Sequence, residues 1–506
     1  MPDSASYSYR PFRLEIRGNL LLSGPIRIGT GERLSLATDA PVLLDHATGF
    51  PYVPGSSLRG GLRDHLEREA GFLGCGQTEI DSLFGLANTD TEDDVSCSGR
   101  LSVFDAYSTS GLTLEVRDHV RLNPRWGAAD SGAKFDAEAA LPADTSSFAV
   151  CLVYEGENAG DRELILLGEA VRFLKSDQAR VGAKSGNGYG RVRLDAVTFS
   201  DFDRCQPTGL ASYLSARMGK PLAPNTSFSF PSPEKKDGNG THDDERSFSA
   251  LTFRLRLHFE GPVLIKAPIP LRREAQGDVS DPGTYAGTGL DEADHVFLSR
   301  ASDNRHYLPG SGIRGVLRSQ ALRIDGILGT KLRGKRLPDV LFGWTKSSEE
   351  KGAKGLLEIG DGELVGEPVT VYLDHVAIDR MTAAAVDSKK FSQAALASPK
   401  FDISVRVQFL RYQVSAVQHA AFLLRDLMGG CLWAGSGVAR GYGYIRSAEV
   451  LSVQGDLLDA LGWQPPDAST TRPGRVGFER SGVFSFSDPA LEWLWQSIDS
   501  SQENPA

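Results

Sequence analysis

One ten-residue phrase occurs twice in this chain of 506 residues: PGSSLRGGLR at 54–63 and PGSGIRGVLR at 309–318. Seven of the ten positions are identical, and the second copy follows the first by 255 residues, about half of the chain. A repeat at such a long spacing is typical of a duplicated domain. The sequence therefore predicts two large related units.

Further short matches keep nearly the same spacing and the same order along the chain. The pairs are Leu83-Phe84-Gly85 with Leu341-Phe342-Gly343, Asp118-His119-Val120 with Asp374-His375-Val376, Lys134-Phe135 with Lys390-Phe391, and Gly188-Tyr189-Gly190 with Gly441-Tyr442-Gly443. The apolar segments that open each half are only 241 residues apart, so the second half carries about 255 − 241 = 14 extra residues before its PGS phrase. We place this insertion in the Gly- and Asp-rich stretch near 277–289.

Composition indicates an ordinary soluble protein with a sizeable core, because 40% of residues are hydrophobic and 24% are charged. The five cysteines are scattered, odd in number and without a CxxC pair, which argues against a disulfide framework and a zinc site. The start of the chain has no apolar segment, so we expect a cytoplasmic protein without a membrane partner. A net charge of −10 argues against a generic nucleic-acid binder, unless basic residues gather in one groove.

A segment rich in Pro, Ser, Gly and charge separates the two halves and cannot bury enough apolar surface to fold alone. The predicted organisation is a first domain at 1–220, a linker at 221–249, a second domain at 250–466 and a C-terminal extension at 467–506. Within the extension, the apolar segment Leu491–Ile498 is expected to dock as a helix.

Each half alternates strand-like and helix-like patterns in the order β-α-β-β-α-β, the ferredoxin-like arrangement of an α+β fold. In the first half the expected elements are strands at 13–22, 101–104, 112–116, 148–154 and 191–199, and helices at 57–71 and 164–174. A long polar segment at 121–143 interrupts this order and is predicted to protrude as a hairpin, with its equivalent at 379–400. Such a fold hosts many functions and settles none by itself.

The PGS phrase is expected to open a helix, with Ser56 and Ser57 as N-caps. Ser311 is the serine of the second copy and, like Ser56 and Ser57, a candidate contact for a bound ligand. Two arginines follow at helical spacing in each copy: Arg59 and Arg63, then Arg314 and Arg318. A helix N-terminus beside two arginines can cradle phosphate. The alternative is a structural role, in which these arginines pair with neighbours such as Asp64 or Glu67.

A glycine-rich stretch closes each half, GAKSGNGYGRVR at 182–193 and GSGVARGYGYIR at 435–446. Glycine lets backbone approach a ligand closely, cationic side chains can meet phosphate, and tyrosine can stack on a base. The candidate RNA-binding residues are Lys184, Asn187, Tyr189, Arg191, Arg440 and Tyr442. The alternative is a tight turn that needs glycine for its geometry. A dinucleotide fingerprint is rejected, because the stretch follows a helix rather than a first strand.

One aspartate precedes each PGS phrase at the same distance: Asp39 lies 15 residues before Pro54, and Asp294 lies 15 before Pro309. A carboxylate beside a phosphate cradle can bind Mg²⁺ or another divalent cation, or position a 2′-hydroxyl for attack. The alternative is a turn-forming aspartate, and Asp291 is a rival to Asp294. The repeated Asp-His pairs resemble part of a triad, but no repeated Ser or Cys accompanies them, so a structural pair near a strand end is favoured.

Together, IRIGTGE, TDAPVLLD, GFPYVPGSSLRGGLR, LFG, DHVRL with its downstream KF, and GNGYGRV resemble the RAMP superfamily, and within it the backbone subunit of type III CRISPR effector complexes. The match covers most of 12–200 and, more loosely, 251–450, so the chain looks like a tandem fusion of two such subunits, as in subtype D arrangements. The resemblance implies two RRM-like units, each with a protruding thumb hairpin and a glycine-rich loop that holds guide RNA.

The resemblance further implies partners and an activity. These are guide RNA, target RNA, other RAMP backbone subunits and a large polymerase-like subunit, with metal-dependent cleavage of bound target RNA at the aspartate ahead of PGSS. Asp39 keeps the TDxPV context of that position, whereas Asp294 matches by spacing alone and follows the insertion. Two alternatives stay open: a guide-RNA scaffold that does not cut, and an endonuclease that processes guide RNA. The sequence leaves open the exact subtype, stoichiometry, guide length and order of the two domains along the guide.

Overall fold

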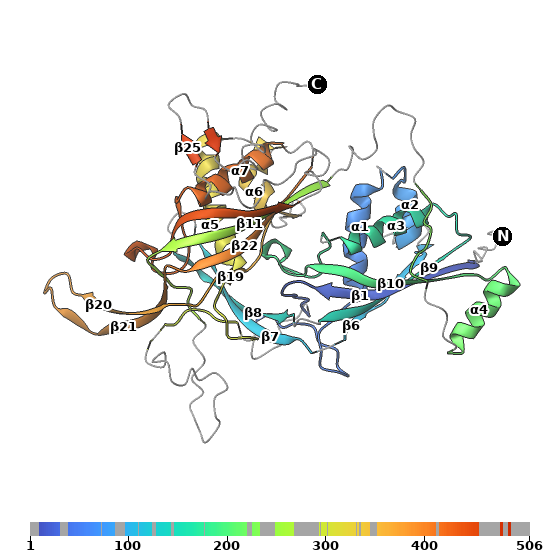
Figure 1. The fold of residues 1–506 in the computed structure, drawn as a ribbon, viewed down its shortest axis with the longest axis horizontal. Helices are drawn as coiled ribbons and strands as arrows, with labels where there is room; N and C mark the ends of the chain where they lie inside the picture. Colours follow the sequence, from blue (N-terminus) through green and yellow to red (C-terminus); the bar gives the residue numbers. More distant parts are fainter. Residues whose placement is uncertain are drawn as a thin grey trace, which may run out of the picture. The chain divides into compact units, whose positions relative to one another are not determined.

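The structure of the protein is a computed structural model, and its ribbon is shown in Figure 1. It describes residues 10–30, 39–71, 73–86, 97–109, 111–123, 128–142, 146–176, 178–219, 225–232, 248–267, 293, 295–300, 302–329, 331–332, 335–344, 352–410, 414–454, 476–478 and 484–486. The chain divides into two compact units. The first comprises Met1–Val116, Asp136–Ser185 and Tyr189–Ser247, and the second comprises Arg117–Phe135, Gly186–Gly188 and Phe248–Ala506.

The first unit is built on an antiparallel sheet in which β1 (Phe12–Leu22) lies between β10 (Val192–Asp203) and β9 (Ser147–Gly156). Alternate residues of β1 are buried, as expected for a strand with one face on the core. On its other side β9 pairs with β5 (Leu101–Val103) and with β6 (Ala106–Ser108), and β6 pairs with β2 (Tyr52–Val53) at the edge of the sheet.

The helices of the first unit pack against one another beside this sheet (Figure 1). They are α1 (Gly55–Glu69), α2 (Gln77–Phe84) and α3 (Glu163–Lys175). Leu58, Leu62 and Leu66 form the buried stripe of α1 that their four-residue spacing predicts. Two helices were not expected from the sequence: α2, and α4 (Pro207–Arg217), which follows β10 and has no buried residue.

The main strands and helices of the second unit follow the same order. Its sheet centres on β11 (Phe248–Glu260), between β22 (Lys400–Leu410) and β24 (Tyr444–Gln454). β22 also pairs with β18 (Leu357–Ile359) and β19 (Gly362–Leu364), β19 pairs with β13 (Tyr307–Leu308), and β24 pairs with β23 (Leu432–Trp433). The helices are α5 (Gly310–Leu328), α6 (Leu337–Phe342) and α7 (Val414–Met428).

A long two-stranded hairpin accompanies each repeat (Figure 1). In the first repeat it joins β7 (Thr113–Leu122) and β8 (Ala129–Leu141), and in the second β20 (Thr370–Ile378) and β21 (Ala385–Ala397). These strands begin earlier than expected, so each Asp-His pair lies within a hairpin strand rather than at the end of a core strand. Smaller pairs are β3 (Gly85–Leu86) with β4 (Cys97–Ser98), β12 (Pro262–Val263) with β21, β14 (Lys331–Leu332) with β15 (Lys335–Arg336), β16 (Gly343–Trp344) with β17 (Ala353–Lys354), and β25 (Val476–Phe478) with β26 (Phe484–Phe486).

The PGS phrase places a helix start directly against a strand. A Cβ atom on Gly55 would lie 2.2 Å from the carbonyl oxygen of Val103, and one on Gly310 would lie 2.4 Å from that of Ile359. Only glycine permits this approach. The predicted serine caps are wrong: α1 begins at Gly55, its N-cap is Pro54 without a side-chain cap, and Ser56 and Ser57 lie exposed in the first turn.

An aspartate from the neighbouring strand segment performs the capping instead. The backbone N–H of Gly55 donates to Asp105 Oδ1 at 2.7 Å, and that of Gly310 donates to Asp361 Oδ1 at 2.9 Å. These aspartates are 256 residues apart, so they are equivalent positions of the repeat. A carboxylate at a helix N-terminus satisfies an otherwise unpaired N–H and interacts favourably with the helix dipole.

Part of the expected linker packs on the first unit. Phe228 and Phe230 lie against its core, with ring centroids 6.2 and 6.0 Å from that of Phe199. The segment Leu491–Ile498, expected to be a helix, lies outside the described residues. Within the part of the chain that the structure describes, no helix has the length and apolar character needed to cross a membrane.

The capping role of Asp105 predicts different outcomes for two substitutions. Asp105→Ala removes the acceptor for Gly55 N–H and is expected to cost about 1 kcal/mol, which lowers the thermal unfolding midpoint by about 2–4 °C for a unit of this size. Asp105→Asn keeps an acceptor oxygen and is expected to unfold close to the wild type. Scanning calorimetry of the full chain measures both, and equal losses for the two variants would contradict capping by this side chain.

Candidate nucleic-acid interface

The arginines after each PGS phrase are held by their own unit. Arg59 lies over the ring of Phe84 at 5.6 Å, and Arg314 lies over that of Phe342 at 5.1 Å. Arg314 Nη2 also donates to the carbonyl oxygen of Phe342 at 2.6 Å. Burial, followed by the nearby charge of Arg318, lowers the pKa of Arg314 to about 10, so it remains charged at neutral pH. These contacts fix the first arginine of each pair against the end of the next helix.

The second arginine of each pair meets an aspartate of that helix. Arg63 Nη2 binds Asp81 Oδ1 at 2.9 Å and its Nε donates to Glu67 at 2.7 Å, whereas Arg318 lies 3.8 Å from Asp339. The structural role that the sequence left open for these arginines is therefore present, and Glu67 is one of the predicted partners of Arg63. Ser56 and Ser57 are exposed and Ser311 is half-buried. A phosphate-binding role for these helix starts stays a prediction.

Backbone hydrogen bonds attach each glycine-rich loop to the segment that follows the central strand. In the first unit, Ala183 N donates to Arg27 O at 2.8 Å and Gly190 N donates to Pro25 O at 2.7 Å. In the second unit, the matching bonds run from Ser436 N to Leu264 O at 2.7 Å and from Gly443 N to Pro262 O at 2.8 Å. Both repeats therefore fold this loop in the same way.

Glycine is required at the anchor points for a steric reason. A Cβ atom would lie 1.9 Å from a carbonyl oxygen at both Gly190 and Gly443, and both residues have positive φ angles, 70° and 72°. At Gly182 and Gly435 it would lie 2.4 and 2.7 Å from the carbonyls that anchor the loop. The tight-turn explanation is correct for these glycines, and it also fixes where the neighbouring side chains lie.

The loop tyrosines are buried in both units. Tyr189 is 3% exposed and Tyr442 is 5% exposed, which leaves little ring surface for stacking on a base. The hydroxyl group of Tyr442 lies 2.9 Å from Nε2 of His375, on strand β20. Here the structure differs from the expected stacking role, because each ring packs beneath its loop. Binding of RNA by these two residues stays a prediction.

Cations gather around the loop of the first unit. Lys184 and Arg191 belong to the loop and are half-buried, and Arg180 forms a β-bridge with Arg191. Arg27 comes from the anchoring segment; burial lowers the pKa of its guanidinium, and its Nε is buried without a hydrogen-bond partner among the described residues. Arg27 and Arg180 were not predicted, although Arg27 stands in the quoted IRIGTGE motif. Asn187 is half-buried in the short 3₁₀ turn of the loop.

The second unit brings different cations to the same loop. Arg440 is exposed, its guanidinium lies 5.6 Å from the ring centroid of Phe391, and its Nη2 lies 3.4 Å from Gln393 Oε1. Burial and the charge of Arg440 lower the pKa of Lys266, which shows that the two cations lie near each other. Two like charges beside a glycine loop attract a phosphate group. Lys266 was missed because its anchoring segment has no motif in this half.

The Asp-His and Lys-Phe motifs form one cross-strand cluster in each hairpin. Lys134 pairs with Asp118 and Lys390 with Asp374, both at 3.2 Å. Each histidine lies on the adjacent phenylalanine: His119 on Phe135 at 5.2 Å, and His375 on Phe391 at 5.0 Å between centroids. The motif thus joins the two strands of the hairpin through an ion pair and a ring contact, in agreement with the structural explanation.

Asp39 lies exposed beside strand β8 of the first unit. Its Oδ2 accepts the backbone N–H of Asp136 at 3.1 Å, and the next residue, Ala40, accepts the N–H of Glu138 at 3.0 Å. In the second unit His295 accepts the N–H of Ala394 at 2.8 Å, so it takes the position of Ala40. Asp294 and its rival Asp291 lie outside the described residues.

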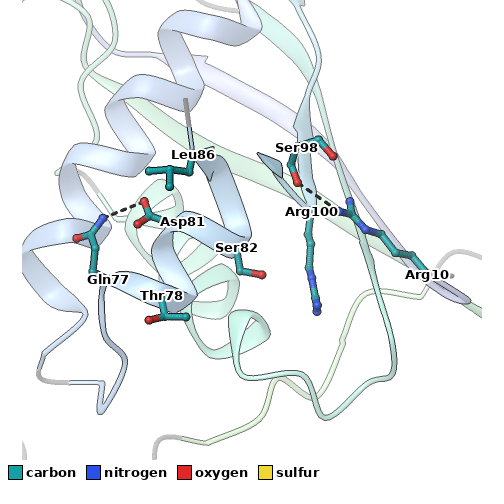
Figure 2. Close-up of a pocket in the computed structure, with 8 residues that line it drawn as sticks. All are labelled: Arg10, Gln77, Thr78, Asp81, Ser82, Leu86, Ser98 and Arg100. Carbon is teal, nitrogen blue, oxygen red and sulfur yellow. Dashed lines mark hydrogen bonds between the residues drawn. The ribbon is translucent and has the colours of Figure 1, made fainter. Parts of the chain in front are cut away.

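The first unit also has a cavity of about 450 Å³, which is shown in Figure 2. Arg10, Gln77, Asp81 and Arg100 are among the residues that line it. Its two arginines are engaged: Arg10 donates to the carbonyl oxygens of Ser98 and Gly99, and Arg100 binds Asp161 at 3.2 Å. No residue proposed from the sequence lines this cavity, so it is not the candidate site.

Comparisons with known proteins agree with this duplicated arrangement. The model of the RAMP superfamily matches residues 20–193 and 256–446, so two related α/β units of one class account for most of the chain. The chain belongs to the RAMP superfamily.

Curated relatives carry the name CRISPR system Cms endoribonuclease Csm3. The protein from Methanocaldococcus jannaschii is 28% identical over 207 residues, 36% of this chain and 80% of the relative. Those from Mycobacterium tuberculosis and Enterococcus italicus are 29% and 25% identical and cover 36% and 38% of this chain, but 86% and 95% of the relatives. About a third of this chain thus spans most of such a relative, which corresponds in size to one repeat.

The loop geometry predicts contrasting effects for two neighbouring glycines of the second unit. Gly443→Ala places a methyl group against the carbonyl oxygen of Ala434 and is expected to cost about 3 kcal/mol or more. Gly441→Ala has a similar φ of 83° but no atom within 4 Å of its Cβ, so only the left-handed backbone cost of about 1–2 kcal/mol applies. Thermal unfolding midpoints should rank wild type, Gly441→Ala, Gly443→Ala; equal midpoints for the two variants would contradict the anchor.

Proposed function

We propose that this chain is a two-repeat backbone subunit of a type III CRISPR effector complex, which binds guide RNA and cleaves complementary target RNA. The observation that carries the proposal is the double occurrence of one arrangement: a glycine loop anchored to the segment after the central strand, with cations around it. Support comes from membership of the RAMP superfamily and from likeness to proteins named Csm3 endoribonuclease. The proposed partners are guide RNA, target RNA, further RAMP subunits and a large polymerase-like subunit.

Guide binding is proposed at the two glycine loops. Lys184 and Arg27 in the first unit, and Lys266 and Arg440 in the second, supply positive charge where the loop backbone is close to the surface. Such sites contact phosphates and read no bases, so base pairing provides the specificity, as in other RNA-guided effectors. Local clustering also reconciles RNA binding with a net charge of −10.

The finer architecture is part of the proposal. Each unit is a ferredoxin-like domain, and the hairpins β7–β8 and β20–β21 are thumbs that displace bases of the guide–target duplex. Apolar side chains exposed on the second hairpin suit contact with displaced bases: Tyr372 is 51% exposed, Val376 48% and Met381 96%. Aromatic and apolar side chains are the usual partners of unstacked bases.

Cleavage is proposed at Asp39, with Asp294 as a second centre. Asp39 is exposed, and its Oδ1 has no hydrogen-bond partner among the described residues. No group of three His, Cys, Asp or Glu side chains that could hold a metal occurs in the described residues. A single carboxylate still fits Mg²⁺, which keeps several waters and is often bound through one carboxylate and substrate phosphates. Such an ion would stabilise the charge that develops on the cleaved phosphate.

Within this site the role of the chain is positioning. The backbone N–H of Asp136 donates to one oxygen of Asp39, and the other oxygen accepts no hydrogen bond from a described residue. The carboxylate can therefore bind a ligand through its second oxygen while the first keeps its hydrogen bond. The anchor, Asp136, belongs to strand β8, so the position of Asp39 is tied to the first hairpin.

Guide binding predicts a graded loss in a charge variant of the second loop. Lys266→Ala with Arg440→Ala is expected to weaken retention of guide RNA and to reduce the salt dependence of binding by about 0.7 per lost phosphate contact. The control is Arg446→Ala, an exposed arginine on strand β24 that pairs with Glu260 at 3.7 Å. Filter binding at several salt concentrations measures both. An unchanged salt slope in the double variant would refute contact at this loop.

The role of Asp39 predicts a loss of cutting without a loss of binding. Asp39→Asn is expected to slow target cleavage by about 100-fold or more, the smallest effect typical of a group that acts in the reaction, while guide RNA still co-purifies. If Asp294→Asn removes a separate set of fragments, the second unit also cuts. Fragment mapping on the reconstituted complex, with and without a chelator, provides the measurement.

Two outcomes decide between the candidate roles of Asp39. Unchanged fragments in both variants would favour the scaffold that does not cut. Loss of guide RNA from Asp39→Asn would instead give this aspartate a structural role.

A further inference from the structure

Asp361 of the second unit makes two contacts with its two oxygens. Oδ1 accepts the N–H of Gly310 at the start of α5, and Oδ2 accepts from Arg117 Nη1 at 2.7 Å. Both side chains are buried, 8% exposed for Asp361 and 7% for Arg117. The guanidinium of Arg117 also lies 4.8 Å from the ring centroid of Tyr307, which is 0% exposed. A helix-capping aspartate and an edge tyrosine thus form a receptor for one arginine.

The first unit has the same receptor, and no described arginine occupies it. Asp105 corresponds to Asp361, and Tyr52 corresponds to Tyr307, at spacings of 256 and 255 residues. Asp105 Oδ1 accepts the N–H of Gly55, and no hydrogen bond or ion pair joins its Oδ2 to a described residue, although the equivalent oxygen of Asp361 binds Arg117. Asp105 is exposed, whereas the side chain of Asp361 is only 8% exposed.

Aromatic side chains lie exposed around this carboxylate. Phe50 is 41% exposed, Phe104 52% and Tyr107 48%, and Tyr107 stacks on Tyr52 at 5.5 Å. We name Phe50, Tyr52, Phe104, Asp105 and Tyr107 the aromatic edge. They stand on β2 and β6 or beside them, at the end of the sheet of the first unit. Exposed aromatic groups around a carboxylate with a free oxygen are typical of a surface that another chain covers.

We propose that the aromatic edge docks a β-hairpin of another protein of the RAMP superfamily, and that an arginine of this hairpin binds Asp105 and lies on Tyr52. This inference rests on the proposed function, because it assumes an assembly of several such subunits. Arginine suits the site, since its planar group pairs with a carboxylate and stacks on an aromatic ring at once. Burial of the surrounding rings supplies the apolar contact area.

Two observations favour a different protein over a second copy of this chain. Arg117 already occupies the receptor of the second unit, and the equivalent residue of the second hairpin is Leu373, which packs inward beside Leu264 and Tyr442.

Site-specific photo-crosslinking tests the docking in the full chain. Tyr107→p-benzoylphenylalanine is expressed in the native host, the tagged protein is isolated and irradiated, and the crosslinked peptides are sequenced by mass spectrometry. The expected product is a peptide from a second RAMP protein, taken from a hairpin strand that carries an arginine. Asp105→Asn in the same background keeps the helix cap and is expected to lower the crosslink yield about tenfold. The matched control is Asp64→Asn, an exposed acid on α1 that pairs with Arg68.

Each outcome bears on the docking surface. A crosslink to a second copy of this chain or to RNA would overturn the proposal, as would a RAMP crosslink that Asp105→Asn leaves unchanged. Guide RNA is measured in the same samples to separate the two proposals. If guide RNA co-purifies and no RAMP crosslink forms, the docking surface is refuted and the proposed function stands. If the crosslink forms without guide RNA, the docking is supported and the proposed function fails.

Discussion

The backbone hydrogen bonds between each glycine-rich loop and the segment after the central strand hold the rest of the proposed interface in place. They require residues without a Cβ at Gly190 and Gly443, because a carbonyl oxygen of the loop itself, from Val181 or Ala434, lies where a side chain would start. In the folded loop the tyrosine is buried, and cationic side chains lie in and beside the loop. The chemistry of the surface therefore follows from a constraint on the backbone.

The duplicated parts that recur at equal spacing have mostly structural roles. The Asp-His and Lys-Phe motifs join two hairpin strands, and the paired arginines of the PGS helices contact the carbonyl and carboxylate groups of the next helix. Such contacts are under the same constraint in both units, since each is needed to fold the unit itself. Other equivalent positions differ between the two repeats: Arg27 corresponds to Leu264, and Asn187 corresponds to Arg440. These differences give the two loops different charges.

Sequence patterns predicted the core well, because a repeated phrase and apolar periodicity report on burial. The strand β1, the leucine stripe of α1 and the helix α3 were confirmed within one or two residues. Other features depend on contacts that are distant in sequence. The capping atom of α1 belongs to Asp105, 50 positions from Gly55, so the nearby serines were a wrong prediction. The burial of Tyr189 and Tyr442 likewise depends on the loop closing over them, which composition does not reveal.

The two units also show how two copies of one fold can differ in what they bind. A receptor made of an aspartate and a tyrosine is filled by Arg117 in the second unit, whereas no described arginine fills it in the first, although the residues that build it are the same. The arginine has no counterpart in the second hairpin, where Leu373 faces the core. The first unit thus offers a receptor, and the second hairpin lacks the arginine that would fill such a receptor in another subunit. Because the missing group is on the hairpin and not in the receptor, identical copies would not join through this contact, and an assembly built with it needs a subunit of different sequence.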